Sequence, residues 1–146
     1  MPDNNCNDTR KTEPCTAFIS SFAYCELPQD EHETTNNFTL LPFIKLNSVP
    51  ERISIKAICS LFGDNFFNDN SVRFLFKDID GRVLVRYDWL LQRGMLEATG
   101  GKIPDALIFH FIIECNIEKT GIYTTEILIN DETIGQYKIH AVVRRD

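Results

Sequence analysis

The sequence predicts an all-β protein, an antiparallel β-sandwich of about seven to nine strands. Three observations support this class. Apolar and polar residues alternate along several runs, the period expected when one face of a strand is buried. Turn-forming residues separate these runs, and no long stretch has the period of an amphipathic helix. Aromatic residues, which are favoured in strands, are frequent: 11 Phe, 4 Tyr and 1 Trp.

Length and composition indicate one globular domain. The chain has 146 residues, 43% hydrophobic and 25% charged, enough to build a core without disulfides or metals. We expect residues 1–14 to be a disordered polar tail and residues 15–146 to form the single domain. The formal net charge of −6 would repel a phosphate backbone, so we expect no nucleic-acid partner.

Targeting signals are missing from the printed sequence. The N-terminal residues have no apolar core typical of a signal peptide, and no run approaches the roughly 18 apolar residues that a membrane helix needs. We therefore expect a cytoplasmic protein that does not bind membranes. The five cysteines are widely and irregularly spaced, unlike a secreted disulfide framework. Cys59 and Cys115 lie in apolar runs and are expected to be buried.

The first half of the chain contains three expected strands. Residues 16–27 are rich in aromatic and small side chains and end at a proline, after which residues 28–37 form a polar loop. Residues 38–46 are a second expected strand, and Pro42 within it suggests an edge position or a bulge, because proline cannot donate to a β-ladder. Residues 52–62 alternate well and predict a half-buried strand.

A hairpin over residues 71–89 is the clearest local unit. Alternating runs flank Asp80-Gly81, and this dipeptide tolerates the positive φ angles of a type I′ turn. The alternation fails in two places. We expect a polar loop at residues 63–70 and a short helical turn around Trp89 to Glu97.

The remaining segments predict a central strand and a closing hairpin. Residues 106–116 are apolar on both faces, which suits a strand covered on each side. Residues 121–129 and 133–143 alternate in matching patterns about a turn. Gly121 before the first of these runs and Tyr123 near its start are typical of a tyrosine corner, whose hydroxyl bonds to backbone upstream.

Two stretches carry a resemblance to a known group of proteins. "SVRFLFKDIDGRVL", followed by "GIYTTEILINDETIGQYKIHAVV", resembles small uncharacterised bacterial or phage proteins that pair a strand, Asp-Gly, strand hairpin with a closing hairpin. The resemblance covers about residues 70–143 and implies an immunoglobulin-like sandwich of bacterial or phage origin. It brings no activity and no catalytic residues. The Cys-Trp-Cys spacing of antibody domains is absent.

Motifs of catalysis and metal binding are absent from the sequence. There is no G-x-S-x-G elbow and no phosphate-binding glycine loop. Paired carboxylates occur only in polar loops, and the sequence places none of them in the partly apolar pocket that a catalytic acid needs. The three histidines and five cysteines lack the close spacing of a zinc site. Asp78 to Gly81 fits a turn better than a calcium loop. We therefore predict neither an enzyme nor a cofactor or metal ligand.

Apolar side chains in irregular segments are the remaining functional signal. We expect the protein to bind another protein, or to self-associate, through its loops or an edge strand. Aromatic residues and Met are enriched in contact surfaces. The interface candidates are Phe66, Phe67, Trp89, Leu90, Met95 and Leu96. The structural alternative is that residues 89–96 fold over one open end of the sandwich.

Two further functions stay open at this point. The protein could bind a small molecule or a metal through residues 63–70 or in a pocket near His110 and His140. It could instead be a structural subunit of a phage or bacterial assembly.

Overall fold

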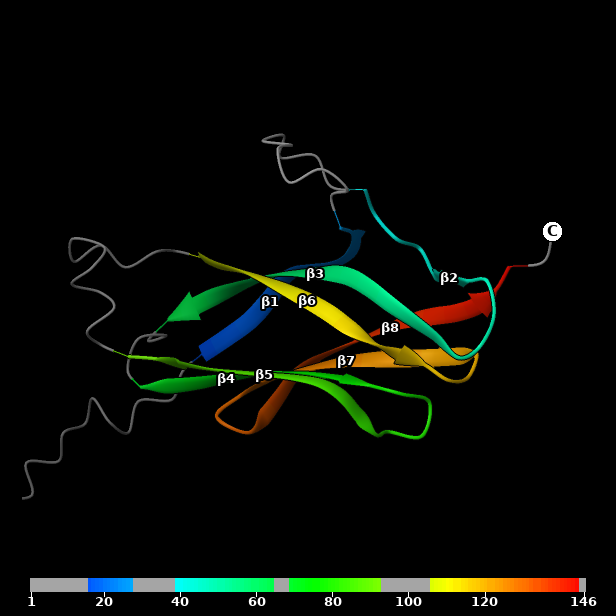
Figure 1. Cartoon of the computed structure of the whole chain (residues 1–146). Helices are drawn as coiled ribbons and strands as arrows, with labels where there is room; N and C mark the ends of the chain where they lie inside the picture. The colour runs from blue at the N-terminus through cyan, green and yellow to red at the C-terminus, as the bar shows by residue number, and fades with distance from the viewer. Residues whose placement is uncertain (1–15, 28–38, 65–68, 93–105, 145–146) are drawn as a thin grey trace, which may run out of the picture.

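Two β-sheets face each other in the computed structural model, which describes residues 16–27, 39–64, 69–92 and 106–144 (Figure 1). The strands are β1 (Thr16–Glu26), β2 (Ile44–Leu46), β3 (Glu51–Asp64), β4 (Asn70–Lys77), β5 (Val83–Leu91), β6 (Ala106–Ile117), β7 (Gly121–Ile129) and β8 (Glu132–Val143). One sheet has the order β1-β3-β6 and the other β2-β8-β7-β4-β5. The predicted sandwich and its number of strands are confirmed.

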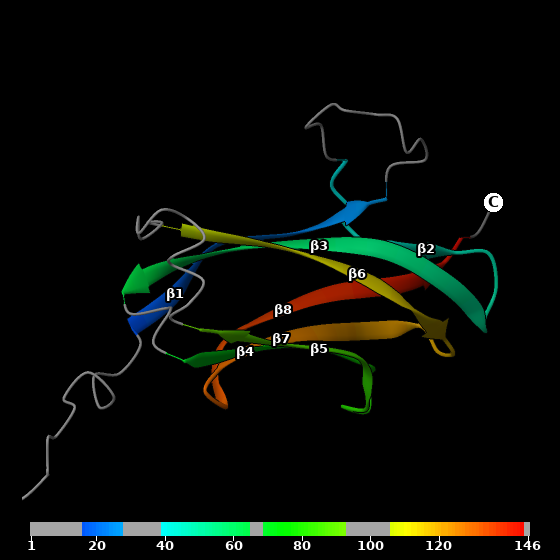
Figure 2. The same cartoon turned by 60° about the vertical axis from the view of Figure 1, so that its left-hand side comes forward.

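The two layers are seen again in a second view, with β3 and β6 above β8, β7, β4 and β5 (Figure 2). All neighbouring strands are antiparallel except β2 and β8, which pair in parallel. None of the described segments forms an apolar helix of bilayer-spanning length.

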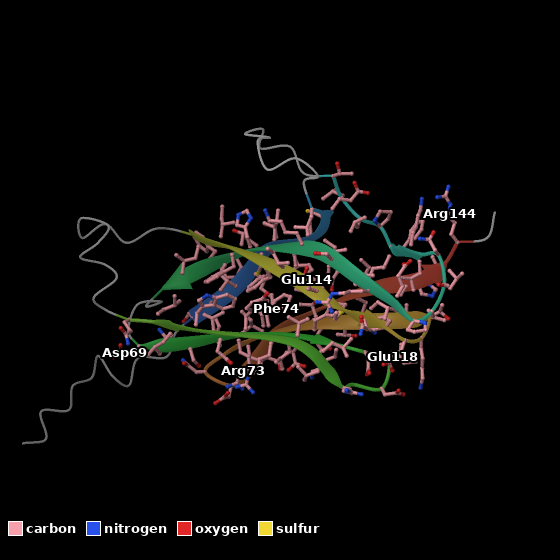
Figure 3. The ribbon with its side chains drawn as sticks, viewed as in Figure 1. Asp69, Arg73, Phe74, Glu114, Glu118 and Arg144 are labelled. Atoms are coloured by element: carbon pink, nitrogen blue, oxygen red, sulfur yellow. The ribbon has the colours of Figure 1, made fainter. Side chains whose placement is uncertain are left out.

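The core lies between the sheets because each strand alternates inward apolar and outward polar residues. Along β4, Phe74 lies between the layers and its neighbour Arg73 points away from them (Figure 3). The rings of Phe74 on β4 and Phe111 on β6 stack across the core with centroids 4.0 Å apart. The largest fully buried side chains are those of Tyr123, Phe74, Phe76, Phe111, Leu46, Leu61, Ile113, Ile117, Ile127, Val72 and Thr125.

One buried hydrogen-bond network joins the two sheets. The hydroxyl of Tyr24 on β1 donates to the carbonyl oxygen of Tyr137 on β8 at 3.0 Å. It also lies 2.6 Å from the hydroxyl oxygen of Thr125 on β7, which is fully buried. Burial raises the pKa of Tyr24 to about 12, because ionising a buried phenol is costly. The network therefore fixes where β1 lies over the five-stranded sheet.

The β4–β5 hairpin is confirmed, but its turn is not the predicted type I′. In this turn only Gly81 has a positive φ, of 83°. The Gly81 N–H donates to the Asp78 carbonyl at 3.1 Å, and the Asp78 carboxylate accepts from the N–H groups of Asp80 and Arg82. This is a type I turn followed by a left-handed glycine, the usual three-residue hairpin loop.

The β7–β8 hairpin carries the turn with two positive φ angles instead. Asn130 and Asp131 have φ values of 50° and 65°, as a type I′ turn requires at both central positions. The predicted tyrosine corner is confirmed at the start of β7. The hydroxyl of Tyr123 donates to the carbonyl of Lys119, four residues upstream, at 2.7 Å.

The expected strand at residues 38–46 is much shorter in the structure. Only β2, Ile44–Leu46, is a strand, and Leu40 makes an isolated bridge to Cys25. Pro42 lies between these two contacts and has no N–H to extend either ladder. The edge position is confirmed, because β2 borders the five-stranded sheet.

The expected helical turn around Trp89 to Glu97 is wrong for its first residues. Residues 89–91 complete β5, paired with residues 70–72 of β4. Gly63 and Asp64 similarly end β3, so the first irregular segment is shorter than residues 63–70. Residues 65–68 and 93–105 lie outside the described part of the chain, as do the expected tail and the loop at 28–37.

The cysteines that the structure describes are buried thiols. Cys25, Cys59 and Cys115 are free and at most 7% exposed, as predicted for the last two. Burial raises the pKa of Cys59 to about 12 and that of Cys115 to about 11. Both thiols are therefore protonated at neutral pH and behave as small apolar side chains.

Candidate functional site

Strand β6 is not the central strand that its apolar sequence predicts. It lies at the border of the three-stranded sheet and pairs with β3 alone among the described strands. From Leu107 onward, its odd-numbered residues face the core, whereas its even-numbered residues face outward and are exposed. The expectation of two covered faces is wrong because the outward apolar residues form part of an exposed surface.

Four large apolar side chains gather on the outer face of the β1-β3-β6 sheet. Phe18 is 52% exposed, Phe62 43%, Ile108 65% and Ile112 48%. On side chains of about 200 Å² each, these fractions correspond to roughly 400 Å² of apolar surface. A patch of this size on a single chain is often functional.

The register places these side chains in one continuous stripe. Phe18 is paired with Phe62, and their rings lie 5.2 Å apart. Ile108 is paired with Ser60, the next outward residue of β3 after Phe62, and Ile112 is paired with Lys56, four residues beyond Ser60. Half-buried Ile58 is the outward residue of β3 between Ser60 and Lys56. We call Phe18, Phe62, Ile108, Ile58 and Ile112 the apolar stripe.

Polar groups border the apolar stripe. His110 is paired with Ile58 inside the stripe and Lys56 with Ile112 at its last position, and burial and the charge of Lys56 lower the pKa of His110. Beyond Ile112, Arg52 and Glu114 form an exposed ion pair of 3.8 Å. Among the described outward residues of this sheet, Lys56 and Arg52 are cations and Glu114 is the carboxylate. This face therefore has a positive charge balance, although the whole chain has a net charge of −6.

The outer face of the five-stranded sheet has a different character. Ion pairs cover its centre: Arg73 with Asp88 and Asp131, Arg86 with Asp88, and Lys77 with Glu126. The shortest joins Lys77 Nζ to Glu126 Oε2 at 2.6 Å, and it lowers the pKa of Glu126. Paired charges of this kind suit contact with water, whereas the apolar stripe does not.

Contacts within the chain occupy part of the free sheet edges. The hydroxyl of Tyr87 on β5 donates to the carbonyl of Ile112 at 2.6 Å, which occupies an outward-directed acceptor of β6. Residues 39–41 bond to the end of β1, and β2 has only three residues. Edge β5 carries the ion-paired Arg86 and Asp88. Charged and capped edges resist pairing with another chain.

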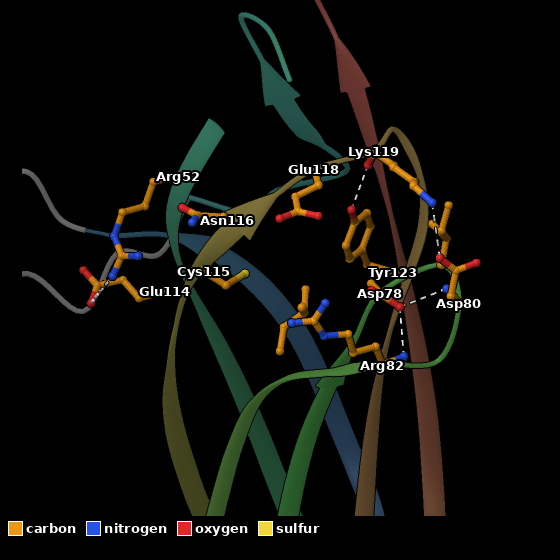
Figure 4. A pocket seen from close by; sticks show the side chains of 12 residues that line it. Arg52, Asp78, Asp80, Arg82, Glu114, Cys115, Asn116, Glu118, Lys119 and Tyr123 are labelled. Carbon is orange, nitrogen blue, oxygen red and sulfur yellow. Dashed lines mark hydrogen bonds and ion pairs between the residues drawn. The ribbon is translucent and has the colours of Figure 1, made fainter. Parts of the chain in front are cut away.

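A polar cleft of about 460 Å³ opens at the end of the sandwich where the β4–β5 turn meets the β6–β7 turn (Figure 4). Asp78 bonds to its own turn, and Lys119 lies 3.5 Å from Asp80. Arg82 and Glu118 point toward the middle of the cleft. The lining also contains the thiol of Cys115 and the ring of Tyr123.

The cleft does not assemble a nucleophile and a base. The pKa of Cys115 is about 11 because the thiol is buried, and the described lining residues include no histidine that would deprotonate it. Across the described parts of the chain, no three His, Cys, Asp or Glu side chains are grouped as metal ligands. The charged and hydrogen-bonding groups of the lining can bind polar molecules.

The predicted pocket near His110 and His140 is wrong. His110 is an exposed residue of β6, and His140 is an exposed residue of β8 in the other sheet. Because the sheets face each other through their apolar sides, these two imidazoles point away from each other. The segment 63–70, the other proposed ligand site, lies partly outside the described residues.

The interface candidates fall into three groups. Phe66, Phe67, Met95 and Leu96 lie outside the described residues. Trp89 is half-buried and packs its ring against Phe109 and Phe111, with centroids 5.6 Å and 4.9 Å away. Leu90 points outward from β5 and is 47% exposed.

The sequence does not predict the apolar stripe, because residues 106–116 are expected to be covered on both faces and Phe18, Ile58 and Phe62 carry no local signal of exposure. The available signal was the run at residues 106–116, which is apolar at both odd and even positions. Such a run indicates either a doubly covered strand or a strand with an exposed apolar face, and topology decides between them.

Comparisons with known proteins identify the fold. No protein-family model and no curated protein matches the chain. Among solved structures, the C-terminal domain of Wzt aligns with a TM-score of 0.52 at 14% identity over 95% of this chain and 87% of that domain.

Two further alignments have lower scores. An immunoglobulin-like protein from Pseudomonas aeruginosa gives 0.49 at 11% identity, over 87% of this chain and 97% of that one. A CARDB domain from Pyrococcus furiosus, solved with di-metal ions, gives 0.47 at 7% identity, over 89% and 96%. By its two sheets and its tyrosine corner, the chain has an immunoglobulin-like β-sandwich fold. The alignment with the Wzt domain, at 14% identity, is a likeness of fold alone.

Proposed function

We propose that this protein is a non-enzymatic binding module that holds a partner protein on the outer face of its three-stranded sheet. One observation carries the proposal: Phe18, Phe62, Ile108 and Ile112 are exposed together, between 43% and 65% each. Covering them on binding would remove roughly 400 Å² of apolar surface from water, worth about 10 kcal/mol before the costs of association are subtracted.

The contrast between the two outer faces supports this choice of surface. The ion pairs of Arg73 and Lys77 place paired charges at the centre of the outer face of the five-stranded sheet. Rim charges of that kind contribute little to affinity, whereas apolar anchors at the centre of a patch contribute most.

Two variants test the proposal against a matched control. The double variant Ile108→Ser/Ile112→Ser alters the apolar stripe, and Ile122→Ser removes an isoleucine of similar exposure, 44%, from the outer face of β7. Each protein is immobilised and exposed to an extract of its source cells, and the retained proteins are quantified by mass spectrometry. We expect a defined set retained by wild type and Ile122→Ser but lost from the double variant.

Equal retention by all three proteins would contradict the proposal. Thermal melts of the variants accompany the experiment, because a loss of binding counts only for a folded protein. Light scattering of the wild type over a concentration series shows whether the retained partner is a second copy of the chain.

A second candidate function is the binding of a small polar molecule in the end cleft. Arg82 and Glu118 direct opposite charges into it, and among the described residues neither belongs to an ion pair. A thermal-shift screen of zwitterionic metabolites tests this function. A stabilisation seen in wild type and absent from Arg82→Ala supports the cleft, and no shift with any compound rejects it.

A further inference from the structure

A groove of about 650 Å³ opens along one side of the sandwich, between residues 40–45 and the first residues of β3. Residues 47–50 lead from β2 in the five-stranded sheet to β3 in the other sheet (Figure 1), so the two walls of the groove belong to different sheets. Its apolar lining includes Leu40, Pro42, Phe43, Ile44, Ile53 and Ile55. The groove contains no residue of the apolar stripe.

The groove lies where β1 stops short of the start of β3. The register of β1 on β3 ends with Glu26 opposite Ile55, whereas β3 begins at Glu51. On their other side, residues 51–54 are paired with β6. Among the described strands, none pairs with residues 51–54 on the side of β1. These four residues thus form a short sheet edge, about 13 Å long at 3.3 Å per residue.

Backbone hydrogen bonds of β1 show which residues of β3 direct polar groups toward this edge. The carbonyl of Tyr24 and the N–H of Glu26 bond to residues 39–41, on the side of β1 that faces away from β3. Because backbone direction alternates along a strand, the N–H and carbonyl of Cys25 point toward β3, where Cys25 is paired with Lys56. Even-numbered residues at the start of β3 therefore direct their backbone groups toward the side of β1.

The backbone of Arg52 favours an extended peptide as the occupant of the groove. Its N–H and carbonyl point to the open side of β3, and no described strand lies opposite them. A polar edge beside an apolar groove suits a bound β-strand, because main-chain hydrogen bonds give affinity and the groove accepts alternate side chains. A helix satisfies its own backbone groups and would leave those of Arg52 unpaired.

The charges of the groove favour a basic peptide. Four charged residues line it: Glu26, Lys45, Glu51 and Arg52. The ion pair with Glu114 offsets the charge of Arg52, which leaves two carboxylates and one ammonium group. Among the described residues, Glu26 belongs to no ion pair. A cation on the peptide therefore complements the carboxylate of Glu26.

The neighbouring sequence of the chain itself does not have this composition. Residues 28–37, "PQDEHETTNN", contain three carboxylates and no large apolar side chain. Carboxylates beside Glu26 and Glu51 would repel them, and polar side chains would not fill an apolar groove. A segment of another protein therefore fits the groove better than this stretch.

We propose that residues 51–54 of β3 bind an extended peptide segment of a partner protein, which adds a strand of about four residues to the sheet where β1 ends. Its inward side chains fill the groove over Ile44 and Ile53, and a basic residue lies beside Glu26. The site is separate from the apolar stripe, so it can be tested independently of the proposed function.

Three fluorescent eight-residue peptides test the inference with the full chain. The first alternates valine with threonine and carries two lysines. The second has the same sequence with N-methyl groups on the threonine amides, which removes the ladder donors that would face Arg52 and keeps every side chain. The third has glutamates in place of the lysines. Affinities are measured by anisotropy at 150 mM salt, where the Debye length is about 8 Å.

We expect the first peptide to bind at least tenfold more tightly than either of the others. Arg52→Pro should weaken its binding at least tenfold, because proline lacks the N–H that faces the groove; a strand tolerates proline where its N–H faces an open side. The matched control Arg52→Ala keeps this N–H and should bind as wild type does. Glu26→Gln should reduce the preference for the lysine peptide over the glutamate peptide to less than threefold.

Each outcome decides one part of the inference. Equal binding of the first two peptides overturns the strand pairing, and this comparison also decides if Arg52→Pro fails to fold in a thermal melt. Failure of the first peptide to bind at millimolar concentration overturns the site, and equal binding of the lysine and glutamate peptides overturns the basic residue.

Two further measurements identify the occupant and separate this site from the proposed function. A dimer in light scattering that the first peptide dissociates would make a second copy the occupant and overturn a different partner protein. The Ile108→Ser/Ile112→Ser protein should bind the first peptide as wild type does. A tenfold loss in that protein would place the peptide on the apolar stripe and overturn the groove.

Discussion

Substitution of Tyr24 by phenylalanine tests how the two sheets are held together. It removes one oxygen atom and with it the 2.6 Å contact to Thr125 and the 3.0 Å bond to the carbonyl of Tyr137. The ring still fills its place. The effect therefore reports the hydrogen bonds and not a cavity.

The magnitude follows from the burial of Thr125. Thr125 is fully inaccessible to water, so its hydroxyl finds no water to bond when the hydroxyl of Tyr24 is removed. An unsatisfied buried polar group costs about 1–3 kcal/mol. For a chain of this length, a loss of about 2 kcal/mol lowers the melting temperature by roughly 4–8 °C.

Denaturant unfolding measures the change, with two comparisons. Thr125→Val combined with Tyr24→Phe removes both partners, and we expect the double variant to be more stable than Tyr24→Phe alone. Tyr87→Phe loses an exposed hydroxyl bond and should cost less than 1 kcal/mol. The reasoning is refuted if Tyr24→Phe unfolds at the wild-type denaturant concentration, or if the two buried substitutions are simply additive.

An alkaline titration gives an independent observation of the same network. The pKa of Tyr24 is raised to about 12 by burial, above the unfolded value of about 10. The stabilisation is complete below pH 10 and is lost as the pH rises from 10 through 12. Tyr24→Phe should remove this part of the alkaline instability.

Three further substitutions test the turn, an ion pair and the exposed face. Gly121→Ala places a Cβ 2.8 Å from Ile79 at a φ of +142°; we expect a loss of about 1–3 kcal/mol in chemical unfolding, and wild-type stability would contradict this. Glu126→Gln should cost about 1 kcal/mol at pH 7. Because Lys77 lowers the pKa of Glu126, this difference should vanish as the pH falls from about 4 through the lowered value, and a pH-independent difference would show another cause. Ile108→Ser should change the melting temperature by less than about 3 °C, since the side chain is 65% exposed; a larger drop would place Ile108 in the core.

The sequence was most informative where a local rule decides the structure. Alternation predicted β3, β4, β5, β7 and β8, and Tyr123 predicted the tyrosine corner, because strand faces and this corner depend on neighbouring residues. The Asp80-Gly81 hairpin was predicted correctly, but its turn type was not, because Asp78 accepts two backbone N–H groups and stabilises the longer loop.

The candidate site depends on contacts that no local rule contains. Ile108 and Ile112 are exposed because no described strand covers the outer face of the β1-β3-β6 sheet. Which side chains of β6 lie on that face follows from its pairing with β3, about 55 residues away in sequence. The pairing register of β1 and β3 places Phe18 beside Phe62 on the outer face of the sheet. Trp89 looked like a loop residue because the segment after it breaks the alternation, yet its ring packs on Phe111.

Site-specific photocrosslinking tests the central claim most directly. A benzophenone amino acid replaces Ile108 on the outer face of the three-stranded sheet, or Ile122 on the outer face of the other sheet, and each protein is irradiated in its source cells. We predict a discrete covalent adduct with a partner protein from position 108 and none from position 122. Adducts from position 122 alone, or identical adducts from both positions, would contradict a binding surface on β1, β3 and β6.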